Sequence, residues 1–301
     1  MRILMVGAGA VGQVLTHHLE KTKSIEVTYL VRPGRKAQLT QLKLLNARTD
    51  ELHVRERPAV LETGARLPPF DTVILAVRAD QVDEAAQVIE SLPSVTRIAS
   101  ASAGSDDVAR LRARFPGRQV VQIVPLFLAF PDGDAIRWWT PPLARTLVTW
   151  EGDEAARPFA EELVKPIVAG GLPAMSVRAL GTARECLYAA GLPVLACFEL
   201  AGWDTGRLGR DRELRALAAQ GAKEALRTVG GGRWMFAVAP GTLVRLVLRA
   251  APLLSQRTQA MWRVHGPKIG AQTRAQLDGF IARGASDGHA EALTELRRRL
   301  A

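Results

Sequence analysis

The chain has 301 residues, a hydrophobic fraction of 48% and a formal net charge of +10. This length suits two domains, and the composition is that of an ordinary globular protein, which excludes a disordered or fibrous chain. The longest apolar stretches, residues 187–198 and 235–254, are too short or too interrupted by arginine to cross a bilayer. We therefore expect a cytoplasmic protein with no membrane segment.

The first half of the chain alternates apolar runs with amphipathic stretches. Strands are predicted at residues 2–6, 25–31, 71–77, 96–99, 119–124 and 143–150, and helices at residues 11–21, 82–92, 106–115 and 154–168. Such alternation is typical of βαβ units. The predicted fold is α/β, with an N-terminal Rossmann domain built on a doubly wound parallel sheet.

The second half shows helical periodicity alone, at residues 179–200, 211–229, 242–263 and 272–284. Glycine and proline at residues 169–173 mark the predicted boundary, which gives a Rossmann domain at 1–172 and an all-helical domain at 173–301. Cys186 and Cys197 would share one helix face and lack metal-ligand spacing, so we expect buried thiols and no metal.

The charge is concentrated in the second half. Residues 1–175 carry a net charge of +1, whereas residues 176–301 carry +9. A basic domain would attract acidic substrates or nucleic acid, although a solvated arginine-rich surface without a partner explains the same excess. Because the basic residues are scattered at helical intervals and not clustered with aromatic residues, we expect no nucleic-acid partner.

Residues Gly7-Ala8-Gly9-Ala10-Val11-Gly12 form a GxGxxG pattern between the first predicted strand and the first predicted helix. That context is required of a dinucleotide-binding fingerprint. Gly7 would permit the tight turn, Gly9 the approach of the pyrophosphate, and Gly12 the packing of the helix on the strand. The helix N-terminus would present N–H groups and a partial positive charge to the phosphates. A chance glycine-rich turn is the alternative.

The residue that ends the second strand distinguishes NAD from NADP. An acidic residue there would bind the ribose 2′-hydroxyl, whereas an arginine accommodates the 2′-phosphate. Arg32 holds this position, followed closely by Arg35 and Lys36. The sequence therefore favours NADP(H), unless Arg32 is merely a solvated loop residue.

In these residues the chain resembles the ketopantoate reductase family. The Gly7–Gly12 loop and Arg32 match its first domain, and the segment from Val77 to Gln81 is similar to its V-K-A-x-Q segment beside the cofactor. The family's Q-N-G loop falls on residues 100–102, without the Asn that contacts nicotinamide and substrate. The resemblance implies that the cofactor is NADPH and that further contacts come from Val77, Arg78, Gln81, Ser100 and Ala101.

The resemblance continues into the second domain with different side chains. The family's helix K-L-x-x-N-x-x-x-N-P, whose Lys is the proton donor, aligns with Arg184, Tyr188 and Leu192 at the Lys and the two Asn positions. Its substrate-binding Glu falls on Thr273. Arginine stays protonated at neutral pH and is a poor acid. We therefore expect a substrate other than ketopantoate.

Tyr188 and Arg184 are the predicted catalytic residues. They are one helical turn apart and should project from the same face. If that face lines the cleft, Tyr188 would donate the proton, and the guanidinium of Arg184 would favour the phenolate or hold a substrate carboxylate. A helix–helix contact with a satisfied hydroxyl is the alternative interpretation.

Other candidates carry a weaker signal. His265 and Lys268, in a predicted Gly-Pro turn between two helices, are alternative acids, although a histidine in such a turn is more often a surface residue. The pair His17–His18 lies on the first helix and is expected to be solvated. Trp138–Trp139 would cap a hydrophobic substrate but is better explained by packing.

Three functions follow. The first is an NADPH-dependent oxidoreductase that reduces the carbonyl of a small, acidic 2-oxo-acid-like substrate. The second is a non-catalytic NADP(H)-binding sensor or scaffold, because the family's Lys, Asn and Glu are missing. The third is a genuine ketopantoate reductase. A homodimer is compatible with all three.

Overall fold

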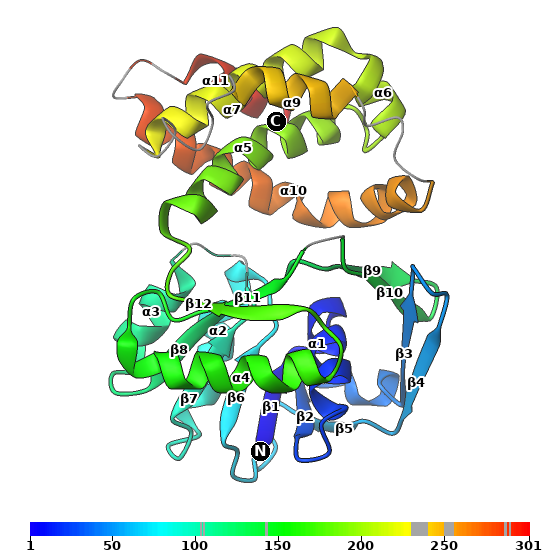
Figure 1. Cartoon of the computed structure of the whole chain (residues 1–301), viewed down its shortest axis with the longest axis vertical. Coiled ribbons are helices and arrows are strands. Elements are labelled where there is room, and N and C mark those ends of the chain that lie inside the picture. Colours follow the sequence, from blue (N-terminus) through cyan, green and yellow to red (C-terminus); the bar gives the residue numbers. More distant parts are fainter. Residues whose placement is uncertain are drawn as a thin grey trace. The chain divides into compact units, whose positions relative to one another are not determined.

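The computed structural model describes residues 1–102, 104, 106–141, 144–229, 240–249, 256–285, 288 and 290–301. The chain divides into two compact units, Met1–Leu180 and Gly181–Ala301 (Figure 1). The first unit extends past the predicted boundary at residue 172, because the strand Ala174–Val177 pairs with the strand Thr146–Thr149 of its sheet.

The first unit is built on an eight-stranded sheet of order β12-β11-β8-β7-β6-β1-β2-β5. Its strands are β1 (Arg2–Val6), β2 (Glu26–Val31), β5 (Ala59–Glu62), β6 (Thr72–Leu75), β7 (Arg97–Ser100), β8 (Gln119–Val124), β11 (Thr146–Thr149) and β12 (Ala174–Val177). Neighbouring strands are parallel except β8 and β11, which are antiparallel. The predicted Rossmann-type sheet is confirmed. Its two edge strands, β5 and β12, were not predicted from the sequence.

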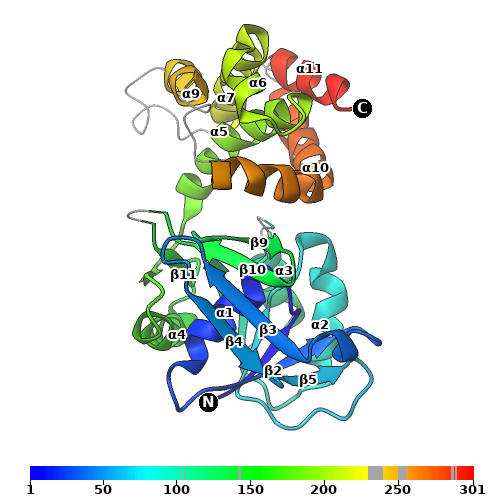
Figure 2. The ribbon, with the colours of Figure 1, turned by 90° about the vertical axis from the view of Figure 1, so that its right-hand side faces the viewer.

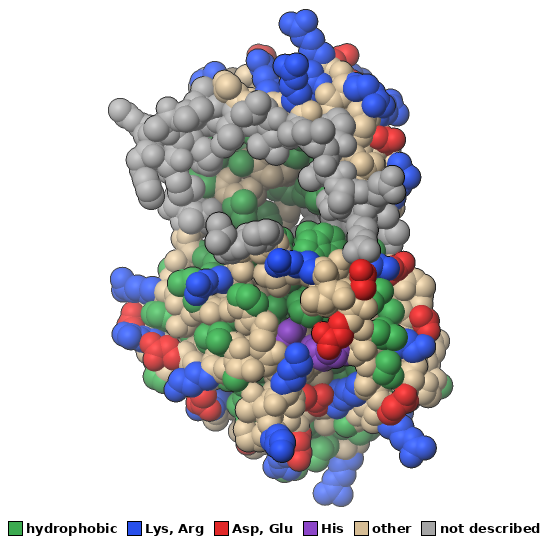
Figure 3. All heavy atoms as spheres, turned by 45° about the vertical axis from the view of Figure 1, so that its right-hand side comes forward, with side chains coloured by type: hydrophobic (Ala, Val, Ile, Leu, Met, Phe, Trp, Pro, Cys, Tyr) green, Lys and Arg blue, Asp and Glu red, His purple; other side chains and the backbone are tan. Residues whose placement is uncertain are grey.

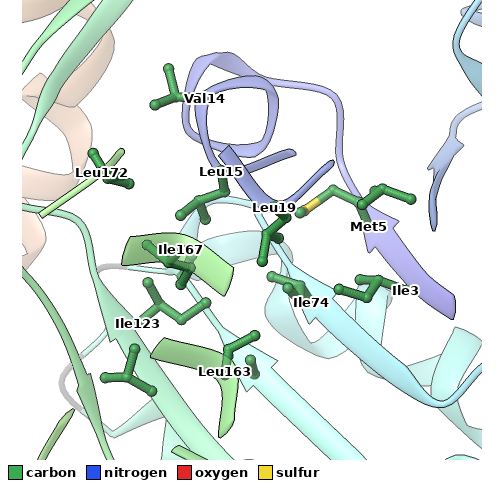
Figure 4. Close-up of a cluster of buried hydrophobic side chains, with 14 of the residues drawn as sticks. Ile3, Met5, Val14, Leu15, Leu19, Ile74, Ile123, Leu163, Ile167 and Leu172 are labelled. Atoms are coloured by element: carbon green, nitrogen blue, oxygen red, sulfur yellow. The ribbon is translucent and has the colours of Figure 1, made fainter. Parts of the chain in front are cut away.

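Helices cover both faces of this sheet, because side chains alternate along each buried strand. Ile3 and Met5 of β1 pack with α1 (Ala10–Glu20) and α4 (Arg157–Ala169), as Figure 4 shows. Leu4 and Val6 face the other way, toward α2 (Val82–Glu90) and α3 (Asp107–Arg114). The continuous apolar run at the start of the sequence is therefore a strand buried on both faces.

A second sheet, which the sequence did not predict, packs against α1 (Figure 2). It has the order β4-β3-β10-β9. Its strands are β3 (Gln41–Asn46), β4 (Leu52–Glu56), β9 (Leu128–Asp132) and β10 (Ala135–Trp139). Trp138 is buried in the shared core, which confirms that it serves packing. Helix α1 is thus enclosed by the main sheet, α4 and this second sheet.

In its described residues the second unit is helical throughout. Its helices are α5 (Gly181–Leu200), α6 (Thr205–Arg210), α7 (Arg212–Thr228), α9 (Pro240–Arg249), α10 (Gln256–Ala285) and α11 (Glu291–Arg299). Cys186 and Cys197 are buried in its core with free thiols, as predicted, and burial raises the pKa of Cys197 to about 12. Among the residues described, no helix combines the length and apolar character needed to cross a membrane.

One prediction for this unit is wrong and another is tested only in part. The helix predicted at residues 242–263 falls on α9 and the start of α10, and residues 250–255 between them lie outside the described residues. The predicted turn around Gly266 lies inside α10. A Cβ on Gly266 would lie 2.1 Å from the Trp203 ring, so this glycine allows close packing of a continuous helix. The side chains of His265 and Lys268 lie outside the described residues.

Candidate functional site

In the glycine loop after β1, two glycines are needed for the fold itself, because a side chain at either position would clash with the backbone. Gly7 has φ +101°, and a Cβ there would lie 2.6 Å from the Ala76 carbonyl oxygen. A Cβ on Gly12 would lie 2.7 Å from the Gly7 carbonyl oxygen. The first and third glycines therefore let the loop turn and let α1 pack closely on the sheet.

Gly9 differs from both. Its φ of −73° is accessible to any residue, and a Cβ would meet no described atom within 4 Å. Gly9 caps the N-terminus of α1 without a side-chain cap, and the first turn of that helix holds no acidic residue. Gln13 steadies the loop, because its Nε2 donates to the Ala8 carbonyl at 2.9 Å. An uncapped helix N-terminus beside open space suits an anion.

A cavity of about 410 Å³ lies at the carboxyl ends of β1 and β2, where ligands bind in open α/β sheets. The predicted cofactor residues that line it are Gly7, Ala8, Gly9, Arg32, Val77 and Gln81. Sequence reasoning missed Leu39, Thr63, Glu84, Ala85 and Val88 in its lining. The available signal for Thr63 was its place directly after β5, a strand that the sequence analysis did not identify.

The rim of this cavity is basic and held in place. Glu62 Oε1 accepts from the backbone N–H groups of Gly34 at 2.8 Å and Lys36 at 3.2 Å, which fixes the loop that carries Arg32. Arg32 Nη2 lies 3.3 Å from Glu84 Oε2, with both side chains largely exposed. Such a surface pair contributes at most about 1 kcal/mol. The guanidinium is therefore free to exchange this carboxylate for a phosphate.

Other predicted cofactor residues occupy different positions. Ala10 and Val11 belong to the first turn of α1, behind Gly9. The exposed Arg78 donates from Nε and Nη2 to Asp80 at 2.9 and 2.8 Å, and this contact raises the pKa of Arg78. Gln81 accepts from the Arg78 backbone N–H at 3.3 Å, which closes the 3₁₀ turn after β6.

The loop after β7 contains a buried polar network that the sequence analysis did not predict. The Ser100 and Ser102 hydroxyls are 2.8 Å apart, and the Ser102 hydroxyl donates to Asp107. The fully buried Asp107 also accepts from the Gly104 N–H at 3.1 Å and from Arg110 Nη2 at 2.6 Å. Ser100 therefore supports the loop from inside. The Ala101 N–H is bonded to the Leu75 carbonyl at 2.8 Å.

The predicted catalytic residues Tyr188 and Arg184 both lie on α5. Tyr188 is half-buried and packs against the core of the second unit. The side chain of Arg184 lies outside the described residues. Leu192 and Thr273 are buried. Within the part of the chain that the structure describes, no group of His, Cys, Asp or Glu is arranged to hold a metal.

The prediction that His17 and His18 are solvated is wrong for His18, and His17 is half-buried. His18 is 2% exposed, and its Nδ1 donates to the Gly170 carbonyl at 2.8 Å. A Cβ on Gly170 would lie 1.9 Å from the His18 carbonyl oxygen, so the end of α4 rests directly on α1. Both imidazoles lie on a helix that is covered on several sides, which helical periodicity alone could not reveal.

The buried imidazole predicts an acid-sensitive first unit. Burial lowers the pKa of His18 from its ordinary value of 6.5 to about 4. Between these values the unfolded chain binds more protons, so stability that is present above pH 6.5 is lost as the pH falls toward 4. We expect this group to remove about 2 kcal/mol from the free energy of unfolding by about pH 5, measured by urea denaturation across a pH series.

A matched variant isolates that contribution. His18→Asn places an amide nitrogen near the position of Nδ1, so a donor to Gly170 remains while the titrating group is removed. The stability of this variant should depend less steeply on pH between 6.5 and 4 than that of the unaltered chain. Parallel pH curves for the two proteins would exclude His18 as the source.

Comparisons with known proteins agree with this architecture. Residues 3–144 match the family described as ketopantoate reductase PanE/ApbA. None of the curated protein sequences compared with the chain matches it significantly. The 2-dehydropantoate 2-reductase of Geobacter metallireducens GS-15 matches with TM-score 0.75 and 16% identity, over 100% of this chain and 99% of its own.

Two further solved structures match along the whole chain. D-mandelate dehydrogenase in a ternary structure with NADH and anilino(oxo)acetate matches with TM-score 0.76 and 14% identity, over 100% of this chain and 97% of its own. The dimeric ketopantoate reductase of Staphylococcus aureus matches with TM-score 0.72, 14% identity and the same coverage. Residues 3–144 of this chain are therefore similar to the ketopantoate reductase PanE/ApbA family, and the whole chain has the fold of these solved oxidoreductases.

Proposed function

We propose that the chain binds NADP(H) in the cavity beside Gly9 and reduces the carbonyl group of a small 2-oxo acid other than ketopantoate. The observation that carries the proposal is the open space above Gly9, which a single Cβ would enter and which continues into a cavity with Arg32 in its lining. A pyrophosphate at the start of α1 and a 2′-phosphate near Arg32 fit this arrangement.

The 2-oxo-acid class is supported by two independent features. The solved neighbours include a dehydrogenase bound to anilino(oxo)acetate and reductases named for 2-dehydropantoate, and both names describe 2-oxo acids. In this chain, residues 176–301 carry a net charge of +9, which favours the approach of an anionic substrate.

The proposed chemistry divides between cofactor and protein. When bound, NADPH supplies the hydride. The developing alkoxide needs a proton, which we assign to the hydroxyl of Tyr188, while Arg184 one turn away on α5 binds the substrate carboxylate through its guanidinium. The hydrogen bonds among Ser100, Ser102 and Asp107 would fix the end of β7, which by the resemblance to ketopantoate reductases would lie beside the nicotinamide.

Reversing the charge of Arg32 should weaken NADPH binding selectively. In Arg32→Glu the new carboxylate repels the 2′-phosphate, so we expect the dissociation constant of NADPH to rise at least ~30-fold, or about 2 kcal/mol, and that of NADH to change much less. Fluorescence titration with both nucleotides measures the effect. Arg48→Glu, an equal charge change at an exposed residue outside the cavity, serves as control. Equal losses for NADPH in both variants would remove Arg32 from the site.

Catalysis is tested by incubating the protein with NADPH and a panel of 2-oxo acids, including ketopantoate, while the absorbance of the reduced nicotinamide is followed. We expect oxidation with at least one 2-oxo acid and little with ketopantoate. If NADPH binds but no member of the panel causes oxidation, the non-catalytic sensor becomes the better explanation. It accounts for a chain that has the reductase fold but carries Arg184 and Tyr188 where the family has Lys and Asn.

A further inference from the structure

A second cavity, of about 270 Å³, lies in the first unit between α1 and the second sheet and shares no lining residue with the cofactor cavity. Its walls include His17 of α1, Tyr29 of β2, Leu44 of β3, and His53 and Arg55 of β4. Histidine side chains are visible at this part of the surface in Figure 3, with both basic and acidic residues close by.

The floor of this cavity carries hydrogen-bond donors without partners. Tyr29 is fully buried and Thr16 is 1% exposed. Their hydroxyls lie within reach of each other and of Arg55, but neither makes a hydrogen bond of regular geometry among the described residues. The same holds for Nη1 of Arg55. Both Thr16 and Arg55 lie near the phenol, and burial raises the pKa of Tyr29, so its hydroxyl stays protonated. A hydroxyl also accepts, so these groups can bond in part to one another. The two hydroxyls and Arg55 Nη1 nevertheless carry more hydrogens than they can share among themselves, so at least one buried donor lacks an acceptor.

The charges of the walls favour an anionic acceptor. Arg55 Nη2 donates to Glu20 at 2.7 Å, which neutralises one cation, and Lys21 adds a second cation at the opening. Burial lowers the pKa of His17 to about 3, so this imidazole is neutral at neutral pH. Among the lining residues, two cations therefore accompany one carboxylate. Glu51, outside the lining, places its carboxylate 3.3 Å from His53 Nε2.

The remaining surface is apolar. Leu42 and Leu44 are each 5% exposed, and the rings of His17 and His53 lie 4.5 Å apart between centroids. A cavity of ~150 Å³ is large enough for a benzene ring. The space above Tyr29 therefore accommodates a ring or a branched alkyl group with one carboxylate.

We propose that this cavity is a binding site for a small organic monocarboxylate with an apolar body. The carboxylate accepts hydrogen bonds from the hydroxyls of Tyr29 and Thr16 and from Arg55, and the body packs between the leucines of β3 and the imidazoles. The site is separate from the proposed cofactor and substrate chemistry, so it stands or falls independently of that function.

Benzoate is a suitable probe, titrated calorimetrically into the full-length chain in the presence of saturating NADPH. We expect saturable binding at one site. Tyr29→Phe removes only an unsatisfied buried hydroxyl, so it should keep or raise the melting temperature while it weakens benzoate binding about tenfold. Benzamide, which has the same shape and no charge, should bind at least ~10-fold more weakly than benzoate.

Leu44→Trp fills the cavity and should abolish benzoate binding, with the circular dichroism spectrum and melting temperature of the same variant reporting whether the first unit is folded. Absence of saturable binding to the unaltered chain would mean that only water occupies the cavity and would overturn the proposal. Benzoate binding that survives both Leu44→Trp and Tyr29→Phe would place the ligand elsewhere and would overturn it equally.

Discussion

Replacing Gly9 by alanine should abolish most dinucleotide binding and leave the first unit folded. The backbone at Gly9 has an ordinary negative φ, and the added methyl meets no described atom within 4 Å, so the apo protein can accept it. The methyl would instead occupy the space through which the pyrophosphate reaches the backbone of α1. We expect the dissociation constant of NADPH to rise about 100-fold, or about 2.7 kcal/mol, in a fluorescence titration.

Gly12→Ala is the matched control for this result. Its Cβ would lie 2.7 Å from the Gly7 carbonyl oxygen, so the same chemical change should lower the melting temperature by distorting the contact between α1 and the loop. A Gly9→Ala protein that binds NADPH as tightly as the unaltered chain would mean that no phosphate approaches this residue. The proposed cofactor site would then be wrong.

Tyr188→Phe should reduce turnover by ~100-fold or more, the usual contribution of a general acid, if Tyr188 protonates the alkoxide. The hydroxyl is absent from the variant, whereas the ring can still pack against the core of the second unit. NADPH affinity should change little, because the described residues that line the cofactor cavity belong to the first unit, whereas Tyr188 belongs to the second. Steady-state rates with the best 2-oxo acid, together with an NADPH titration, separate these two effects.

The exposed neighbour Leu187 supplies a control on the same helix. Leu187→Ala changes a side chain that is 64% exposed and should leave turnover within about threefold of the unaltered chain. Turnover by Tyr188→Phe that matches this control would exclude Tyr188 as the acid and leave the proton donor to another residue. A loss of NADPH affinity in Tyr188→Phe would indicate a structural role instead.

The features that the sequence predicted are those encoded locally. β1, the glycine loop and α1 follow one another within the first twenty residues, and each glycine acts on a neighbouring turn or helix. Arg32 directly follows Val31, the last residue of β2, so its position at the cavity could be predicted from strand length alone. Parallel β-strands buried on both faces produce the continuous apolar runs that identified the main sheet.

The second sheet could not be predicted in the same way. β4 has a half-exposed pattern with charged residues, and β3 pairs in parallel with β10, a strand far along the chain. Such pairing depends on tertiary contacts that no local pattern records. Once that sheet covers α1, His18 becomes buried, which explains why a helix position that looked solvated lies in the core.

Tertiary contacts also explain why the turn predicted at Gly266 is absent and why part of the cavity lining was not predicted. Gly266 and Pro267 form a typical turn sequence, yet the glycine lies inside α10 because Trp203 packs against it. Thr63, directly after β5, and Glu84 of α2 both line the cofactor cavity, and only the folded structure brings them together. Local sequence identified the glycine loop at one wall of the cavity, whereas the residues of the opposite wall could be found only from the three-dimensional structure.

The central claim is that the first unit binds a nicotinamide dinucleotide and prefers the 2′-phosphorylated form. The most direct measurement is a titration of the unaltered chain with NADPH and NADH, followed by the fluorescence of the reduced nicotinamide. We predict saturable binding of one nucleotide per chain, with NADPH bound at least ~10-fold more tightly and the preference reduced at high salt, where the phosphate–guanidinium attraction is screened. Failure of both nucleotides to bind, or a clear preference for NADH, would contradict the account.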